Sequence, residues 1–224
     1  MIDLSKSYEY FHPEEVRERI HIIGCGSVGG TLAELLVRLG LTKLTLWDFD
    51  DVEAHNLANQ IYRQKDIGRK KTEALLDILA EINPDVRNDA KLMSDGWDEQ
   101  ELSGYVFLAV DNIELRRKIA QQHLYSIEIK AMFDFRTGLE DAQHYACDWS
   151  DIRKKKDFLK SMDFSHEEAA QATPVSACGV ILGVAPTVRG ICAVGIANFV
   201  NFARGKGLKK MMAFDIFMPD LMAF

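Results

Sequence analysis

A glycine-rich turn, Gly24-Cys25-Gly26-Ser27-Val28-Gly29, lies between two apolar segments and is the feature that most constrains the fold. Residues 19–23 before it are largely apolar and β-branched, as in a strand, and residues 32–39 after it follow a helical apolar pattern. Such a turn exposes backbone N–H groups at the start of a helix, where the helix dipole favours an anionic phosphate. The turn therefore predicts a nucleotide site.

A second short apolar segment, residues 44–48, ends in Asp48 and completes a β-α-β unit within the first 50 residues. An acid at the end of this second strand is placed to accept hydrogen bonds from ribose hydroxyls. By itself, the stretch from Gly24 to Asp48 also permits NAD binding and hence a NAD-dependent oxidoreductase. Nothing further along the chain, however, offers a hydride-transfer site.

Strands and helices alternate along the next part of the chain, which predicts a Rossmann-like, doubly wound and mainly parallel sheet. The predicted elements are a helix over 72–82 stopped by Asn83-Pro84, strands over 86–92 and 105–110, and a helix over 112–124. An antiparallel extension is expected over 133–147, and an edge strand over 212–217.

One domain is expected over residues 1–224, because 47% hydrophobic content and only five prolines show no composition break. Within it we expect a nucleotide-binding part at about 19–130, a crossover segment at about 148–175, and a packing helix at about 187–204. This crossover segment includes the basic run 153–156, which is most often a solvated helix face, although it could steer an acidic partner.

Charge and hydropathy exclude several classes of protein. A net charge of −7 argues against a general nucleic-acid binder. No run of eighteen apolar residues and no secretory leader occur, so a cytoplasmic protein without a membrane segment is expected. The four cysteines form no C-x-x-C pair, so no zinc is expected.

Polar and basic residues follow Asp48. Asp50, Asn56, Asn59 and Gln60 stand where they would line a nucleotide, and Arg69-Lys70-Lys71 follows them. Cations at this place suit a triphosphate better than a nicotinamide.

These motifs together resemble the ThiF/MoeB/HesA family, bacterial relatives of ubiquitin-activating enzymes, from about Arg19 to Arg204. The matching pieces are the turn from Gly24 to Gly30, Leu44 to Asp50, Asn56-Leu57 with Gln60, Gly68 with Lys71, Asn83-Pro84, and Asp111-Asn112 with Arg116. The segment Ala177-Cys178-Gly179-Val180 is a further similarity.

The resemblance implies a role for each matching residue. Asp48 would hold the ribose, and the backbone of Gly24, Gly26, Ser27 and Gly29 would approach the nucleotide. Lys71 would neutralise the β- and γ-phosphates of ATP, with Arg69 or Lys70 nearby. Asp111, followed by Asn112, would hold Mg²⁺; alternatively, Asp111 serves only as a helix N-cap. Asp50, Asn56 and Gln60 would line the site.

Two features depart from the family pattern. Asn59 stands where members usually carry a phosphate-contacting arginine, and Arg63 is the candidate to replace it. The zinc cysteines of many members are also missing. Buried structural thiols are the default for Cys147, Cys178 and Cys192, and Cys178 is the first candidate if a thioester forms.

The resemblance implies adenylation of the C-terminal carboxylate of a small ubiquitin-like or sulfur-carrier protein, with pyrophosphate as the leaving group, by a homodimer. A tRNA-modifying branch of the same family is an alternative, which the acidic charge disfavours. A nucleotide-binding module without catalysis is another, because the arginine is missing.

Overall fold

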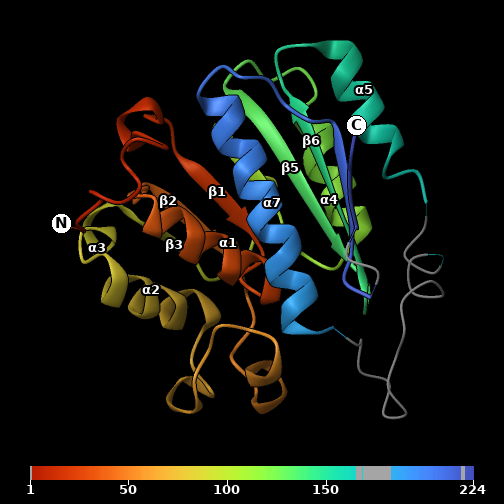
Figure 1. Cartoon of the computed structure of the whole chain (residues 1–224). Coiled ribbons are helices and arrows are strands. Elements are labelled where there is room, and N and C mark those ends of the chain that lie inside the picture. The colour runs from red at the N-terminus through yellow and green to blue at the C-terminus, as the bar shows by residue number, and fades with distance from the viewer. Residues whose placement is uncertain (1, 165–167, 169–182, 218–219) are drawn as a thin grey trace.

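The computed structural model describes residues 2–164, 168, 183–217 and 220–224. Within them, eight strands form one sheet in the order β3-β2-β1-β4-β5-β6-β7-β8 (Figure 1). The strands are β1 Ile20–Ile23, β2 Leu44–Trp47, β3 Lys91–Met93, β4 Gly104–Leu108, β5 Ile129–Thr137, β6 Asp141–Asp148, β7 Met211–Asp215 and β8 Asp220–Ala223. The first five pair in parallel and β6 to β8 are antiparallel, which confirms the predicted mixed sheet.

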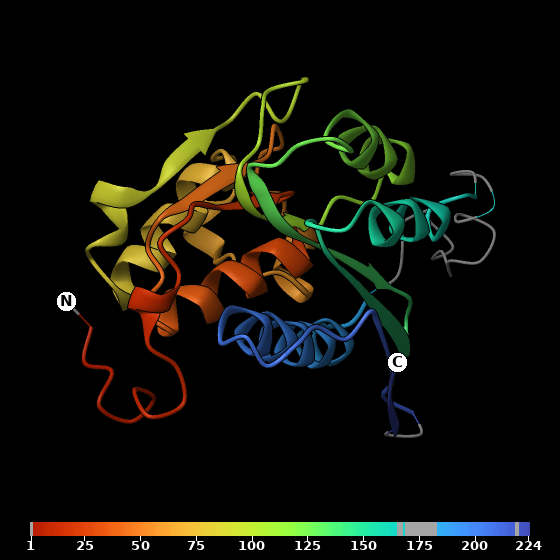
Figure 2. The same cartoon turned by 90° about the horizontal axis from the view of Figure 1, so that it is seen from above.

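Helices cover both faces of the sheet (Figure 2). One face carries α1 (Ser27–Arg38), α2 (Lys71–Ile82) and α7 (Ala185–Ala203); the other carries α4 (Ile113–Gln122) and α5 (Ile152–Lys160). The short helices are α3 (Val86–Asp89) and the 3-10 turns η1 (Pro13–Glu15), η2 (Ala54–Ala58) and η3 (Gln64–Asp66). Among the described helices, none is long and apolar enough to cross a membrane.

Successive side chains along a strand point to opposite faces of the sheet, so each face has its own apolar core. Ile22 and Phe107 belong to the core beneath α1 and α7, whereas Ile23 and Leu108 belong to the core beneath α4 and α5. Helix α7 approaches β5 closely, because a Cβ on Gly195 would lie 2.3 Å from the ring of Phe135.

The predicted strand over 86–92 is mostly wrong. Val86 is fully buried and starts a single helical turn. The N–H of Val86 donates to the carbonyl of Asn83, which holds this turn directly after the end of α2. Only Lys91–Met93 pair as β3, alongside Thr45–Trp47 of β2. The turn that begins at Asn83-Pro84 therefore continues through a short helix before the strand starts, which the local pattern does not indicate.

The antiparallel extension over 133–147 is confirmed, because β5 and β6 pair antiparallel from Ala131 opposite Asp148 to Thr137 opposite Ala142. Its first strand begins earlier than predicted, at Ile129. On its other side, β5 pairs in parallel with β4, because α4 crosses over between them. At the far edge, β7 occupies most of the predicted 212–217 strand, but β8 pairs outside it and forms the edge.

Candidate functional site

The candidate site lies where the carboxyl ends of β1, β2 and β4 meet. The strand order reverses between β1 and β4, which is where ligands bind in open parallel sheets. The Gly24 N–H donates to Trp47 O at 2.8 Å, and the Ala109 N–H donates to Ile23 O at 2.8 Å. The glycine turn therefore lies between Asp48 on one side and residues 109–111 on the other.

Each glycine of the turn has a different reason to lack a side chain. Gly24 has φ +96°, and a Cβ there would lie 2.9 Å from the backbone of Ala109. A Cβ on Gly29 would overlap Gly24 O at 1.8 Å, so this glycine lets α1 pack on the end of β1. Gly26, by contrast, has no atom within 4 Å of its Cβ position. The open space beside Gly26, at the first turn of α1, suits an approaching phosphate.

Asp48 ties the glycine turn to the end of β2. Its Oδ2 accepts from the Cys25 N–H at 2.6 Å, and its Oδ1 accepts from the Asp50 N–H at 2.9 Å. Burial raises the pKa of Asp48, while these two hydrogen bonds oppose the rise. Each oxygen keeps a lone pair, so the carboxylate can still accept from a ribose hydroxyl.

Lys71 is the first residue of α2, and its side chain is buried beside the glycine turn. Its Nζ lies 2.7 Å from Asp50 Oδ2. The hydroxyl of Tyr62 lies 2.6 Å from Cys25 O and 3.2 Å from Lys71 O, which connects the start of α2 to the turn. Burial raises the pKa of Tyr62, so this phenol stays protonated as a donor.

The two basic residues before Lys71 have other partners. Lys70 pairs with Asp51 at 3.0 Å, and Arg69 donates to Asp66 at 3.2 Å and to Asp77 at 2.6 Å. Of these three cations, Lys71 is therefore the one that the structure brings to the glycine turn.

Asp111 follows the end of β4 and is exposed. Its carboxylate makes no hydrogen bond or ion pair with any other residue that the structure describes. The alternative that Asp111 is only a helix N-cap is wrong, because Asn112 caps α4 by accepting from the Leu115 N–H at 2.9 Å. The Asn112 side-chain oxygen is thus engaged within α4.

The residues present fit a magnesium ion held together with a nucleotide. Mg²⁺ prefers oxygen ligands and usually takes one or two carboxylates, with phosphate oxygens and water completing its shell. Asp111 has free oxygens and lies at the same sheet edge as the glycine turn. It is the residue that would hold the ion.

Arg63 is not gathered with this cluster. Its guanidinium lies 2.6 Å from Glu81 near the end of α2, whereas Lys71 begins that helix. Lys71 and Glu81 are ten positions apart on the helix, a rise of about 15 Å. Arg63, as it stands in this structure, therefore does not replace the family arginine.

Asn56 and Asn59 fix the loop through hydrogen bonds, whereas Gln60 does not. The Asn59 amide donates to Gly183 O at 3.2 Å, just before α7. Asn56 is buried and accepts from the Glu53 N–H at 2.8 Å, which caps η2. The Gln60 Oε1 is buried without a hydrogen-bond partner among the described residues.

The described cysteines are poor nucleophiles. Cys25, Cys147 and Cys192 are buried, and burial raises the pKa of each thiol, that of Cys147 to about 12. Cys178, the first candidate for a thioester, lies outside the described residues.

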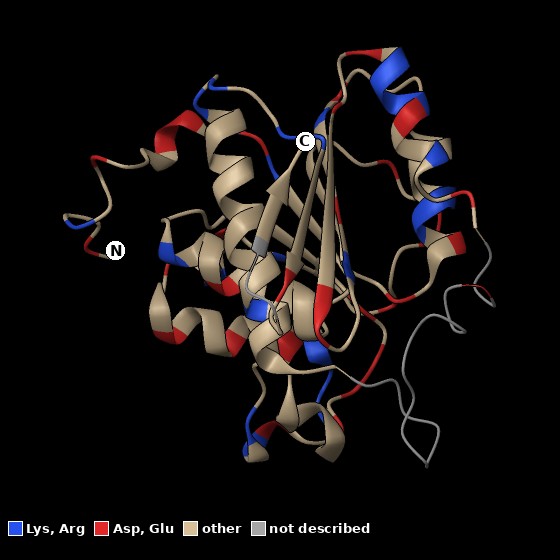
Figure 3. Ribbon diagram, turned by 45° about the vertical axis from the view of Figure 1, so that its right-hand side comes forward, with Lys and Arg blue, Asp and Glu red and all other residues tan. Residues whose placement is uncertain are grey.

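The basic run lies on α5 (Figure 3). Its side chains divide between solvent and core. Arg153, Lys154 and Lys156 are exposed. Lys155 is buried and donates to Leu124 O at 2.9 Å and to Ser126 O at 3.1 Å, which holds α5 against the end of α4.

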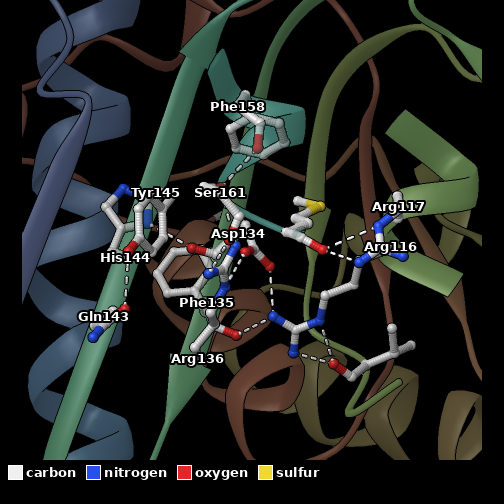
Figure 4. A network of polar contacts seen from close by, with 12 residues as sticks. Arg116, Arg117, Asp134, Phe135, Arg136, Gln143, His144, Tyr145, Phe158 and Ser161 are labelled. Atoms are coloured by element: carbon white, nitrogen blue, oxygen red, sulfur yellow. Dashed lines mark hydrogen bonds and ion pairs between the residues drawn. The ribbon is translucent and has the colours of Figure 1, made fainter. Parts of the chain in front are cut away.

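The structure contains a buried charge network beside the site that the sequence pattern does not predict (Figure 4). Asp134 in β5 is fully buried and pairs with Arg116 of α4 at 2.5 Å and with Arg136 at 2.7 Å. Arg116 was identified only as part of a motif. Nothing local indicates its partner, which lies 18 residues away on another element.

Curated proteins match part of this chain in sequence. Ubiquitin-like modifier-activating enzyme 5 of Arabidopsis thaliana is 45% identical over 74 residues, which cover 33% of this chain and 17% of that protein. The protein of the same name from Dictyostelium discoideum is 34% identical over 116 residues, covering 45% and 30%. The match thus spans less than a third of each relative's length.

Solved structures match over a longer stretch. PaaA superposes with a TM-score of 0.72 at 15% identity, covering 99% of this chain and 68% of that one. Escherichia coli MccB, determined with ATP, superposes with a TM-score of 0.69 at 14% identity, covering 95% and 65%. The model of the ThiF family matches residues 15–198, most of the sequence. With the glycine turn, Asp48, Lys71 and Asp111 at one sheet edge, this match establishes that the chain belongs to the ThiF family.

Proposed function

We propose that this chain uses ATP to adenylate the C-terminal carboxylate of a small ubiquitin-like or sulfur-carrier protein, with release of pyrophosphate. The observation that carries the proposal is the meeting of four groups at one edge of the sheet. These are the open backbone beside Gly26, the Asp48 carboxylate, the Lys71 ammonium and the Asp111 carboxylate, which has no partner among the described residues. The names of the modifier-activating relatives support the same class of substrate.

Each group has a distinct task in this reaction. The backbone from Gly24 to Gly29 would take the phosphates at the first turn of α1, and Asp48 would accept from the ribose hydroxyls. Lys71 would neutralise the β- and γ-phosphates, and Asp111 would hold Mg²⁺. When bound, the metal ion supplies charge neutralisation at the phosphates.

The chemical step needs no strong general base. The incoming carboxylate is already ionised near pH 7, so an oxygen of it attacks the α-phosphorus directly. The new O–P bond forms as the bond to the pyrophosphate oxygen breaks, giving an acyl-adenylate and pyrophosphate. The chain contributes alignment and charge neutralisation.

The assay is pyrophosphate release with ATP, Mg²⁺ and a β-grasp protein that ends in Gly-Gly. Asp111→Ala should abolish release, and Lys71→Ala should reduce it strongly. Asp51→Asn removes an exposed carboxylate of the nearby loop and should leave release unchanged. Equal rates in wild type, Asp111→Ala and Lys71→Ala would remove the proposed mechanism.

A second function, nucleotide binding without catalysis, is favoured by one observation. Asn59 occupies the usual arginine position, and Arg63 pairs with Glu81 instead of facing the glycine turn. A subunit of this kind would bind Mg²⁺-ATP but give no pyrophosphate exchange unless a partner supplied the cation. We also propose that the chain forms a homodimer.

A further inference from the structure

Arg116 lies directly behind the loop that carries Asp111. Its Nε donates to Val110 O at 2.7 Å, and its Nη2 also contacts this oxygen. Val110 immediately precedes Asp111, so the bond fixes the peptide group from which the Asp111 backbone continues. Arg116 itself is 7% exposed.

The other end of the guanidinium is anchored in β5. Its Nη1 donates to Asp134 Oδ1 at 2.5 Å and to Phe135 O at 2.6 Å (Figure 4). Arg136 Nε donates to the second oxygen of Asp134 at 2.7 Å, and its Nη1 donates to Ser161 O at 2.7 Å. Arg116 is therefore held by groups that are themselves fixed.

Other hydrogen bonds hold the two ends of the loop. The Ala109 N–H donates to Ile23 O at the start of the loop, and Asn112 caps α4 at its end. Between these points, among the described residues, Arg116 is the side chain that bonds the backbone of Val110. Its loss would free the part of the loop that orients the Asp111 carboxylate.

We infer that Arg116, locked by Asp134, is a positioning residue that sets the orientation of Asp111 toward magnesium and the nucleotide. This inference rests on the proposed function. A guanidinium suits the task because its planar donors reach Val110 O on one side and Asp134 with Phe135 O on the other. An ammonium, which is a point donor, cannot span both sides.

Arg117 provides a matched control on the same helix. It donates to Met162 O at 3.0 Å and to Phe164 O at 2.7 Å, beyond the end of α5, and among the described residues it makes no hydrogen bond to the 109–112 loop. Removing it also breaks arginine–carbonyl bonds, here partly buried ones, but leaves the hydrogen bonds of the Asp111 loop in place.

The experiment measures pyrophosphate release as a function of Mg²⁺ concentration in wild type, Arg116→Met, Arg116→Lys and Arg117→Met, with thermal unfolding of each. Loss of folded protein alone lowers the maximal rate without moving the Mg²⁺ concentration at half-maximal rate. A misoriented Asp111 raises that concentration and lowers kcat per folded molecule. A misplacement of about 1 Å can cost on the order of 100-fold in rate.

We expect Arg116→Met to raise the half-maximal Mg²⁺ concentration about tenfold or more and to lower kcat. Arg116→Lys should fall between it and wild type, and Arg117→Met should match wild type in Mg²⁺ dependence. If Arg116→Met does not fold, Arg116→Lys is measured in the same way. Unchanged Mg²⁺ dependence in the folded Arg116 variants would overturn the inference. An inactive wild type would instead contradict the proposed function.

Discussion

The Lys71 ammonium lies 2.7 Å from Asp50 Oδ2, and the two side chains differ in exposure, 9% for the lysine and 49% for the aspartate. A triphosphate over the glycine turn would share this cation with Asp50. Without Lys71, the phosphates would face an uncompensated carboxylate. The pair therefore predicts that losing Lys71 alone is more harmful than losing Lys71 together with the charge of Asp50.

Lys71→Ala should lower kcat/KM for ATP about 100-fold, because a preorganised cation at the phosphates is lost. Adding Asp50→Asn to that variant should recover part of the loss, since the repulsive carboxylate is then removed. Pyrophosphate release by the single and the double variant measures the coupling between the two side chains. Lys65→Ala, which removes an exposed lysine paired with Glu81, should have no effect. A double variant no better than Lys71→Ala would contradict this account of the pair.

Two glycines of the same turn should fail in different ways. Gly29→Ala places a methyl group 1.8 Å from Gly24 O, so the end of β1 and the start of α1 cannot keep their packing. We expect it to cost at least about 3 kcal/mol of unfolding free energy. Chemical denaturation of the purified variant measures this cost.

Gly26→Ala should fold normally, because its Cβ position is open and its φ of −73° suits alanine. The methyl group would enter the space that we assign to a phosphate, so Mg²⁺-ATP affinity should fall about tenfold, a change of roughly 1.4 kcal/mol. Calorimetric titration measures the affinity. Unaltered affinity in a folded Gly26→Ala protein would show that the nucleotide does not lie beside this residue.

Asn59→Arg should strengthen nucleotide binding. A charge-assisted hydrogen bond to a phosphate contributes about 1.5–3 kcal/mol, more than the neutral bond to Gly183 O that is lost, so KM for ATP should fall about tenfold. Steady-state kinetics measure KM. Asn59→Ala is the control, because it removes the Gly183 contact without adding a cation and should not lower KM.

Two buried histidines should make the protein less stable in mild acid. Burial lowers the pKa of His21 and of His144 to about 4, below the usual 6.5. The His144 Nε2 lies 3.2 Å from the Asn198 amide nitrogen, which donates to it, so the ring must stay neutral there. Between pH 6.5 and pH 4 the unfolded chain therefore binds more protons than the folded one.

The unfolding free energy should consequently fall as pH drops through this window, by on the order of 3 kcal/mol for each histidine. Denaturant unfolding at several pH values measures the slope. His144→Gln should flatten it, whereas His55→Gln, at an exposed position, should not. An equal slope in wild type and His144→Gln would show that His144 does not titrate in this way.

The parts of the fold that local pattern controls were predictable from the sequence. The turn from Gly24 to Gly29, the end of β2 at Asp48 and the helix beginning at Lys71 each follow from residues within a few positions. The segment 86–92 was not, because a helical turn held by the Asn83 carbonyl competes with the strand pattern. The start of β5 at Ile129 was not predictable either, since it depends on parallel pairing with β4.

Contacts between distant residues account for most of what the sequence did not reveal at the site. Asp134 lies between Arg116 and Arg136 only because β5 passes beside the end of β4. Arg63 is near the motif in sequence, yet its partner Glu81 lies at the far end of α2. Spacing along the chain indicates which residue types a site needs. It does not indicate which of those residues are held away from the site by an ion pair with another residue.

A crystal structure with Mg²⁺ and a non-hydrolysable ATP analogue tests the central claim most directly. The account predicts a triphosphate over the Gly24–Gly29 turn, a ribose at Asp48, phosphate oxygens at Lys71 and the metal ion at Asp111. A nucleotide bound elsewhere, or an empty turn under saturating nucleotide, would contradict this binding mode.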